Sequence, residues 1–349
     1  MDQLSMNLSE VIGRGTFGTI YSYLDKYAVK VAKTTKAGDQ LEEEVDILEK
    51  CKGEGIPTVY SMATHLGNQC VVMELLGESL QSKFNQAHKS FEYSTVARIG
   101  LQMIDRLEHI HNCGIVHRDL KPSNICVGLE DESKLYLIDF GLSVKLSKDC
   151  FGYQNKRKSR GFEGNFFFSA AESQLDNTIS KKSDYESLTY IMLLFLKQDL
   201  PWGDLCNEGA KNNELIARMK NDEAIEKLCE GLPEEFREFV FYIRNLESNY
   251  SPNCQFLKNL LLKSLGKGSS KTSLPKFEWE SISPSLKPKK RSKKSHHSKT
   301  PLTSPPAQSP AKTTSGSSPK HFTYKKRQKK LTSKILDQGL IPEGLFECL

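Results

Sequence analysis

The hydrophobic pattern divides the chain into a strand-rich opening, a helical middle and a polar C-terminal region. Over about the first 75 residues, short β-branched runs such as KYAVKVAK (26–33) alternate with glycine turns and predict antiparallel strands. Within this part, Leu41, Val45 and Leu48 recur at i, i+4 and i+7, which predicts one amphipathic helix over 39–51. We therefore expect a sheet accompanied by a single helix.

Beyond Gly77 the hydrophobic period becomes helical. One face of the stretch 93–114 gathers five apolar side chains: Val96, Ile99, Met103, Leu107 and Ile110. The stretch 184–198 is apolar almost all round, which is typical of a helix buried in a large core. The stretch 232–246 opens with a proline and two glutamates, a favourable helix start. This part is expected to be mainly helical.

The composition changes at Lys267, where Ser, Pro, Lys and Thr begin to dominate. Residues 267–349 contain 18 Lys and Arg against 5 Asp and Glu, a net charge of +13, so the whole-chain charge of +6 leaves −7 for residues 1–266. With so little apolar surface, the region 267–349 is expected to be mostly disordered. Its basic run KPKKRSKKSHHSK (287–299) favours nuclear import, or contact with nucleic acid or chromatin, over a merely solubilising role.

Several protein classes are disfavoured. The start of the chain lacks a basic segment followed by an apolar run, so no signal peptide is predicted. The longest apolar run, YIMLLFL (190–196), is far shorter than the ~20 residues of a membrane span. The nine cysteines show neither CxxC nor zinc-ligand spacing. We expect a monomer with free thiols that is nuclear, cytoplasmic or both, and not bound to membranes.

A glycine motif opens the strand-rich part. IGRGTFGTI (12–20) contains Gly13, Gly15 and Gly18 in the order G-x-G-x-x-G. Such glycines let backbone N–H groups approach phosphate oxygens, although an ordinary turn is the alternative. A dinucleotide fold would require a helix next, whereas here another strand follows.

Lys30 lies in the middle of the apolar strand that follows. Burying a lysine there is costly unless an anion pairs with it. The next helix offers Glu42, Glu43 and Glu44, and Glu44 borders the apolar stripe. We therefore expect Glu44 to face inward and pair with Lys30.

The stretch HRDLKPSNICV (117–127) concentrates reactive side chains. Asp119 can accept a proton from a hydroxyl, and Lys121 can neutralise charge on a phosphoryl group in transfer. Twenty residues after Asp119, the run LYLIDFGLS places Asp139 at the end of an apolar strand. Asp139 and Asn124 offer the oxygen ligands that Mg²⁺ prefers.

Together and in this order, these motifs resemble the signature set of eukaryotic Ser/Thr protein kinases over roughly residues 5–265. Lys121 followed by Pro122 resembles the Ser/Thr branch. Four further stretches resemble the casein kinase I family: GEGIPTVY, VVMELLGESL, SDYESLTYIMLLFLKQDLPW and LCEGLPEEFREFVFYIRNLESNYSPNCQFLKNLL. The vaccinia-related kinases are the nearest alternative, but they usually carry glycine where Arg118 stands and tyrosine where Phe140 stands.

The resemblance implies an α+β, bilobal protein-kinase fold with a small β-rich N-lobe (1–76), a larger helical C-lobe (77–266) and a disordered basic tail (267–349). It implies ATP and Mg²⁺ as cofactors. It further implies transfer of the γ-phosphoryl group to Ser or Thr hydroxyls in acidic or phosphate-primed protein substrates. A nucleotide-binding scaffold without catalysis is disfavoured, because every expected acid, lysine and glycine is present.

The resemblance also assigns roles to residues. Asp119 would orient the acceptor hydroxyl, Lys121 and Asn124 would serve phosphate and metal, Asp139 would hold Mg²⁺, and Asp184 would brace the catalytic loop. Lys30, paired with Glu44, would hold the α- and β-phosphates. The ATP-binding residues implied are Ile12, Gly13, Gly15, Gly18, Ile20, Ala28, Lys30, Glu44, Met73, Glu74, Leu76, Cys126 and Asp139.

The chain departs from the casein kinase I pattern near the expected substrate groove. The stretch GNFFFSAAES (164–173) has Asn165 in place of a threonine, and its AAE resembles the A-P-E of other kinases. The family's arginine pair is here Lys181-Lys182, which lacks the bidentate fork of arginine, so phosphate priming is expected to be weaker. Lys220 is a further candidate for that phosphate pocket. Cys126 replaces a larger aliphatic residue under the adenine.

Two regulatory hypotheses follow from the sequence. The basic stretch NKRKSRG (155–161) is either a solvated loop or, with Arg118, a receiver for a phosphate on Ser159 or on the substrate. Five Ser-Pro or Thr-Pro pairs lie in the tail, whose positive charge would be attracted to the acidic catalytic part. We therefore expect the tail to restrain the enzyme, and phosphates on these pairs would weaken the attraction.

Overall fold

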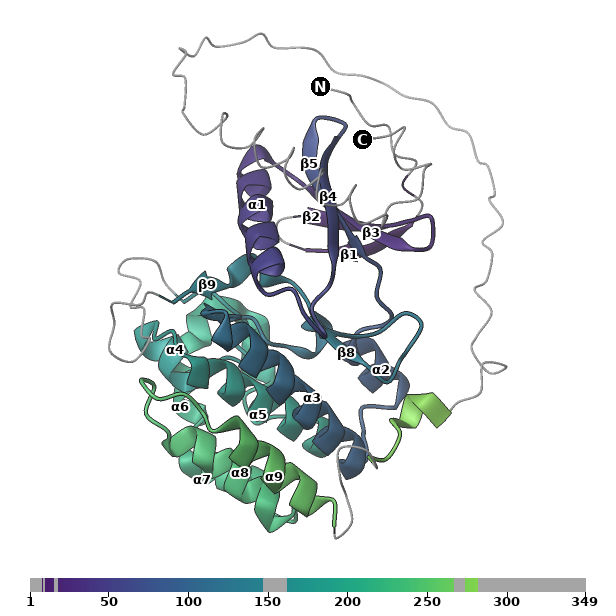
Figure 1. Cartoon of the computed structure of the whole chain (residues 1–349). Helices are drawn as coiled ribbons and strands as arrows, with labels where there is room; N and C mark the ends of the chain where they lie inside the picture. The colour runs from purple at the N-terminus through teal and green to yellow at the C-terminus, as the bar shows by residue number, and fades with distance from the viewer. Residues whose placement is uncertain (1–7, 9, 16–17, 147–161, 267–273, 282–349) are drawn as a thin grey trace, which may run out of the picture. The chain divides into compact units, whose positions relative to one another are not determined.

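The computed structural model describes residues 8, 10–15, 18–146, 162–266 and 274–281. Within this part, a β-sheet lobe precedes a helical lobe, as Figure 1 shows. This is the two-lobed α+β architecture that the sequence predicted. The expectations for Ser159, for the basic run 287–299 and for the tail other than 274–281 concern residues outside the described ranges.

The N-terminal lobe is built on a five-stranded antiparallel sheet in the order β1-β2-β3-β5-β4. Its strands are β1 (Val11–Arg14), β2 (Gly18–Tyr23), β3 (Tyr27–Ala32), β4 (Val59–His65) and β5 (Asn68–Glu74). Leu24 and Asp25, with left-handed φ of 53° and 51°, turn the chain within the three-residue loop 24–26 that joins β2 to β3. This register places Lys30 opposite Ile20 on one side and Val71 on the other.

Helix α1 (Thr35–Lys50) packs against this sheet. It begins four residues before the stretch that the apolar stripe indicated, because the Thr34 side chain accepts a hydrogen bond from Ala37 N (3.2 Å) and caps the helix there. The stripe residues Leu41, Val45 and Leu48 are all buried, and so is Glu44. The helix therefore presents Glu44 to the sheet.

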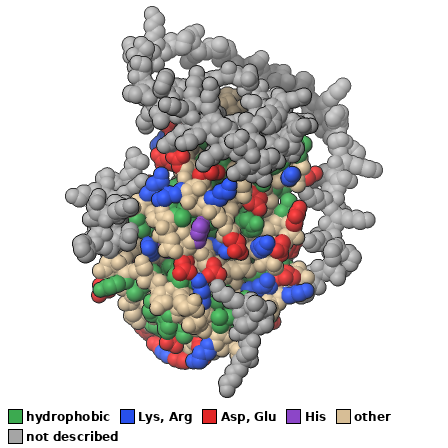
Figure 2. Space-filling model, in the orientation of Figure 1, with side chains coloured by type: hydrophobic (Ala, Val, Ile, Leu, Met, Phe, Trp, Pro, Cys, Tyr) green, Lys and Arg blue, Asp and Glu red, His purple; other side chains and the backbone are tan. Residues whose placement is uncertain are grey.

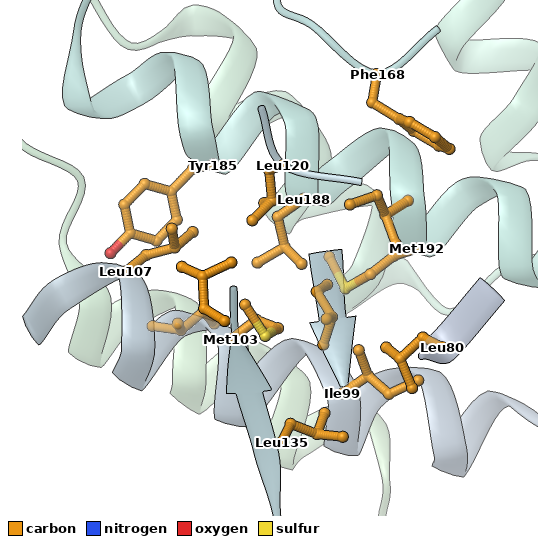
Figure 3. Close-up of a cluster of buried hydrophobic side chains, with 14 of the residues drawn as sticks. Leu80, Ile99, Met103, Leu107, Leu120, Leu135, Phe168, Tyr185, Leu188 and Met192 are labelled. Atoms are coloured by element: carbon orange, nitrogen blue, oxygen red, sulfur yellow. The ribbon is translucent and has the colours of Figure 1, made fainter. Parts of the chain in front are cut away.

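The C-terminal lobe consists mainly of helices. They are α2 (Leu80–Gln86), α3 (Tyr93–Asn112), α4 (Ala171–Asp176), α5 (Lys181–Lys197), α6 (Asn213–Met219), α7 (Asp222–Cys229), α8 (Glu234–Asn245) and α9 (Cys254–Ser264). Helices α3 and α5 pack together in the core, where Figure 3 shows Ile99, Met103 and Leu107 facing Leu188 and Met192. The three predicted helical stretches correspond to α3, α5 and α8.

Two small two-stranded sheets hold the loops of the helical lobe that carry the predicted catalytic residues. β6 (Ile115–Val116) pairs with β9 (Val144–Lys145), and β7 (Ile125–Val127) pairs with β8 (Leu135–Leu137). The HRDLKPSN loop therefore runs from β6 to β7, and Asp139 is the second residue after β8. Both loops are fixed at their ends by antiparallel pairing.

Residues 274–281, which the sequence placed in the basic tail, pack on the helical lobe. The ring of Phe277 stacks on that of Trp279 (centroids 4.4 Å apart), and Trp279 contacts Phe91. Arg98 on α3 lies 4.0 Å from the Phe277 ring centroid and forms an ion pair with Glu280 (2.6 Å). The indole N–H of Trp279 donates to Glu132 O (3.1 Å). This segment is therefore part of the folded domain.

The described residues also bear on membrane spans, surface charge and cysteines. Among them, no helix combines the length and the apolar character needed to cross a bilayer. On the face shown in Figure 2, acidic and basic side chains of the described residues are interspersed. The seven cysteines within the described ranges are free thiols.

Candidate active site

A buried ion pair joins the sheet to α1. Lys30 Nζ donates to both carboxylate oxygens of Glu44 (2.8 and 2.7 Å) and to Asp139 Oδ1 (3.2 Å). Burial alone would lower the pKa of Lys30, but the charges of Glu44 and Asp139 raise it above that of a free lysine. Lys30 is thus held as a cation at the junction of three segments, paired with Glu44 as the apolar stripe predicted.

Asp139 stands at a bend of the chain. Its φ of 65° lies in the left-handed region, which is unusual for a residue with a side chain. Burial opposes ionisation of its carboxyl group, but Lys30, followed by Lys121 and His117, lowers its pKa below 3.8. The Asp139 side chain is 41% exposed although it contacts Lys30. An ionised and accessible carboxylate is what a hard cation requires.

The HRDLKPSN loop brings three predicted residues into mutual contact. Lys121 Nζ lies 2.5 Å from Asp119 Oδ2, and Asn124 Nδ2 donates to Asp119 O (2.9 Å) and to Asp119 Oδ2 (3.1 Å). The short 3-10 turn Pro122–Asn124 between them folds the asparagine back onto the aspartate. Asp119 Oδ2 is therefore held by both the Lys121 ammonium group and the Asn124 side-chain amide.

The Asp184 carboxylate fixes the backbone of the HRDLKPSN loop. Its carboxylate accepts hydrogen bonds from His117 N (2.8 Å), Arg118 N (2.9 Å) and His111 Nε2 (2.8 Å). Burial would raise the pKa of Asp184, but the hydrogen bond and charge of His111 lower it below 3.8. Arg118 is held at a φ of 70° by these contacts. The bracing contacts expected of Asp184 are present.

The remaining predicted nucleotide-contacting residues lie on strands β1, β2, β3 and β5, in the links after β1 and β5, and on β7. Ala28 is paired with Met73 across β3 and β5, and Gly13 with Ile20 across β1 and β2. Glu74 ends β5, and Leu76 lies two residues later in the link to the helical lobe. Cys126 is buried on β7 and bridges to Ser79, and burial raises the pKa of its thiol to about 12. Ile12 is exposed.

The glycine motif forms the β1–β2 hairpin. A Cβ added at Gly18 would lie only 2.8 Å from Val31 O, so β3 leaves no room for a side chain there. At Gly15 the nearest described atom to an added Cβ is Gly18 O at 3.8 Å, an ordinary contact distance. Gly18 thus serves packing, while the Gly15 N–H donates to Gly18 O (2.9 Å) and the Gly15 carbonyl accepts from Lys33 Nζ (2.6 Å). A small pocket beside them is lined by Gly18, Lys30, Ala32, Ala37, Gln40, Leu41, Glu44 and Gly141.

These residues fit a magnesium nucleotide. In the described ranges, no group of three or more His, Cys, Asp or Glu side chains could hold a metal ion by itself. Mg²⁺ usually takes only one or two protein carboxylates and completes its shell with phosphate oxygens and water. Asp139 and the amide oxygen of Asn124 would hold it in this way. A bound phosphate oxygen would replace Asp139 as the third acceptor of the Lys30 ammonium group, which Glu44 would continue to hold.

The stretch that departs from the casein kinase I pattern has its own internal contacts. Asn165 Oδ1 accepts hydrogen bonds from Phe167 N (2.9 Å) and Phe168 N (3.1 Å), which turns the chain toward α4. Glu172 forms an ion pair with Lys182 (2.8 Å) and accepts a hydrogen bond from Ser248. The carboxylate of Glu172 thus already neutralises one of the two lysines expected to attract phosphate.

Some participants were missed by the sequence interpretation. His117 contacts Ile138 O through Nε2 (3.0 Å) and receives the Asp119 N–H at Nδ1 (3.3 Å), and so links the two loops. The docking of Phe277 and Trp279 was missed as well. The pair of aromatic residues in KFEWES, isolated in a polar region, was the available signal.

Comparison with known families agrees with this geometry. A protein-family model described as the protein kinase domain matches residues 6–267, which cover most of the chain and include Lys30, Glu44, Asp119, Asp139 and Asp184. The paired Lys30 and Glu44, the bent Asp139 and the Asp119 loop are the parts that phosphoryl transfer requires. The chain belongs to the protein kinase family.

Proposed function

We propose that this protein kinase is a Ser/Thr kinase of casein kinase I type, which transfers the γ-phosphoryl group of ATP to hydroxyl groups of acidic protein substrates. The observation that carries the Ser/Thr assignment is the 2.5 Å contact between Lys121 and Asp119. A lysine beside the carboxylate places positive charge where a short Ser or Thr side chain would deliver its oxygen. The casein kinase I assignment is supported by the four sequence stretches named above.

The proposed chemistry divides among the residues already described. Asp119 accepts the proton of the acceptor hydroxyl and orients its oxygen, and Lys121 stabilises the negative charge on the phosphoryl group. Lys30 binds phosphate oxygens and is itself held by Glu44. When bound by Asp139 and Asn124, Mg²⁺ supplies charge neutralisation at the phosphates. Asp184 keeps the loop in the conformation that points Asp119 at the acceptor.

Contacts of the lysines support acidic over phosphate-primed substrates. Lys182 is buried and paired with Glu172, and Lys220 is buried and hydrogen-bonded within the protein. A substrate phosphate would have to displace those partners. Positive charge for acidic side chains is present in the sequence of the stretch 155–161, which contains four basic residues. An acidic, unprimed peptide is therefore the proposed preferred substrate.

The test uses radiolabelled ATP with Mg²⁺ and three acidic peptides that differ only at the acceptor, which is Ser, Thr or Tyr. A fourth peptide carries a phosphoserine in the priming position. We expect label on the Ser and Thr peptides, with the primed peptide no better than its unprimed twin. Label confined to the Tyr peptide, or no transfer to any peptide, would refute the assignment. The Asp119→Asn variant, purified in parallel, controls for a contaminating kinase.

A further inference from the structure

Among the described residues of the C-terminal lobe, Lys220 is the least exposed lysine. It follows α6, its exposure is 1%, and its ammonium group makes three hydrogen bonds. The acceptors are Phe166 O (2.9 Å), Ser169 O (2.7 Å) and Gln174 Oε1 (2.8 Å). All three belong to the stretch 166–174, so one cation fastens nine consecutive residues to α6.

The fastened stretch adjoins the catalytic loop. A Cβ added at Gly164 would lie 3.2 Å from Arg118 O and 3.3 Å from Ser169 Oγ, and the Glu163 carboxylate lies 3.7 Å from the Arg118 guanidinium. Arg118 directly precedes Asp119. A peptide that delivers its hydroxyl to Asp119 must therefore pass along the residues that Lys220 holds.

The hydrogen-bond count of Lys220 depends on its charge. An ammonium group has three N–H donors, which match its three acceptors, whereas a neutral amine has two. The rings of Tyr190 and Trp202 lie 5.1 and 5.3 Å from Nζ and also favour the cation. Loss of the proton would therefore release one contact to the stretch 166–174.

The charges around Lys220 come from three neighbouring elements. Burial lowers the pKa of Lys220 to about 7; Glu186 on α5 and Cys206 oppose this lowering, and Arg244 on α8 adds to it. Tyr190 on α5 also faces the ammonium group. The protonation state of Lys220 thus changes close to neutral pH.

We propose that Lys220 is a positioning residue for the peptide substrate, because its ammonium group holds the stretch 166–174 in the conformation that receives the acceptor peptide. This inference rests on the proposed kinase function and deepens it. It also replaces the sequence hypothesis in which Lys220 binds a substrate phosphate, since the side chain is buried away from the surface and all three donors are used inside the protein.

The test compares the full-length protein with its Lys220→Met variant between pH 6 and pH 9. Both are assayed with an acidic Ser peptide that has an acetylated N-terminus and contains no histidine. For Lys220→Met we expect the peptide KM to rise by about tenfold or more, the effect of losing charge-assisted hydrogen bonds, while the KM for ATP stays unchanged. The wild-type peptide KM should rise above about pH 7, and the variant should lack this rise.

Two further variants complete the design. Lys227→Met, which removes an exposed lysine on α7, is the matched control and should behave as wild type. Glu186→Gln keeps the side-chain shape but removes the charge that supports protonation of Lys220, so the wild-type inflection should move to lower pH. If Lys220→Met fails to fold, as judged by its melting curve, the Glu186→Gln profile decides the question.

The outcomes separate this inference from the proposed function. Absence of phosphate transfer by the wild-type protein at every pH would remove the proposed function and this inference with it. Active wild-type protein whose peptide KM and pH profile match those of Lys220→Met would overturn the inference alone. The inference would also be overturned if Lys220→Met lowered kcat and raised the KM values for peptide and for ATP by the same factor. An inflection at the same pH in Glu186→Gln and in the wild type would overturn it as well.

Discussion

The docked segment 274–281 gives a prediction that the sequence alone would not have made. Trp279 is only 7% exposed, and it packs on Phe277 and Phe91 while its indole N–H is hydrogen-bonded to Glu132 O. Replacing it with alanine would leave the Phe277 ring without its stacking partner. It would also expose the apolar surface of Phe91 and weaken the attachment of the whole segment.

The magnitude follows from the burial. Truncation of a buried tryptophan or phenylalanine to alanine typically costs about 3–5 kcal/mol. Because a terminal segment can detach before the rest of the domain unfolds, the lower end of this range, about 3 kcal/mol, is expected for Trp279→Ala. For a domain of this size each kcal/mol lowers Tm by about 2–4 °C, so the melting temperature should fall by roughly 6 °C or more.

The assay is thermal denaturation of full-length protein, with Tyr250→Ala as a matched aromatic control. Tyr250 is 59% exposed, so its truncation should change the free energy of unfolding by less than about 0.5 kcal/mol. A Trp279→Ala protein that melts with the wild type and with Tyr250→Ala would show that the segment does not contribute to stability. The reasoning about its docking would then be wrong.

Three further predictions concern the cleft and the tail. Glu44→Gln should destabilise the protein by about 3 kcal/mol, because it leaves Asp139 as the only carboxylate paired with the buried Lys30 cation, and it should raise the KM for ATP. Urea denaturation and ATP titration measure the two effects, and wild-type values for both would contradict the role of the pair. Cys126→Leu should lower the KM for ATP by the equivalent of about 1 kcal/mol, since a larger side chain restores contact under the adenine, and no gain would count against that placement. Truncation after Ser281 should raise kcat/KM if the tail restrains the enzyme, and equal values for truncated and full-length protein would remove that hypothesis. Truncation at 266 is unsuitable because it deletes the docked segment 274–281.

Parts of the site could be predicted because their determinants are local. The apolar stripe of α1 fixes which face of the helix is buried, and Glu44 shares that face, so its pairing with Lys30 was predictable. Asp119 and Asn124 are five residues apart in one loop, and their contact requires only a short turn. Periodicity of 3.6 residues likewise located the main helices.

Other parts could not be predicted because they depend on tertiary packing. The acceptors of Lys220 lie 46 to 54 residues away in the chain, and nothing in its local sequence distinguishes it from a solvated lysine. The pairing of Glu172 with Lys182 needs α4 and α5 to be placed first. Trp279 lies in a short segment flanked by polar residues, which shows no hydrophobic periodicity. Its ring nevertheless packs against Phe91, just before α3.

The central claim is that the Asp119 carboxylate receives and orients the hydroxyl that accepts the phosphoryl group. The most direct measurement is the kcat of Asp119→Asn with saturating magnesium ATP and an acidic Ser peptide. Loss of the general base should lower kcat by about 10²–10⁴-fold, while the KM for ATP stays close to the wild-type value. A variant that transfers phosphate as fast as the wild type would contradict the claim.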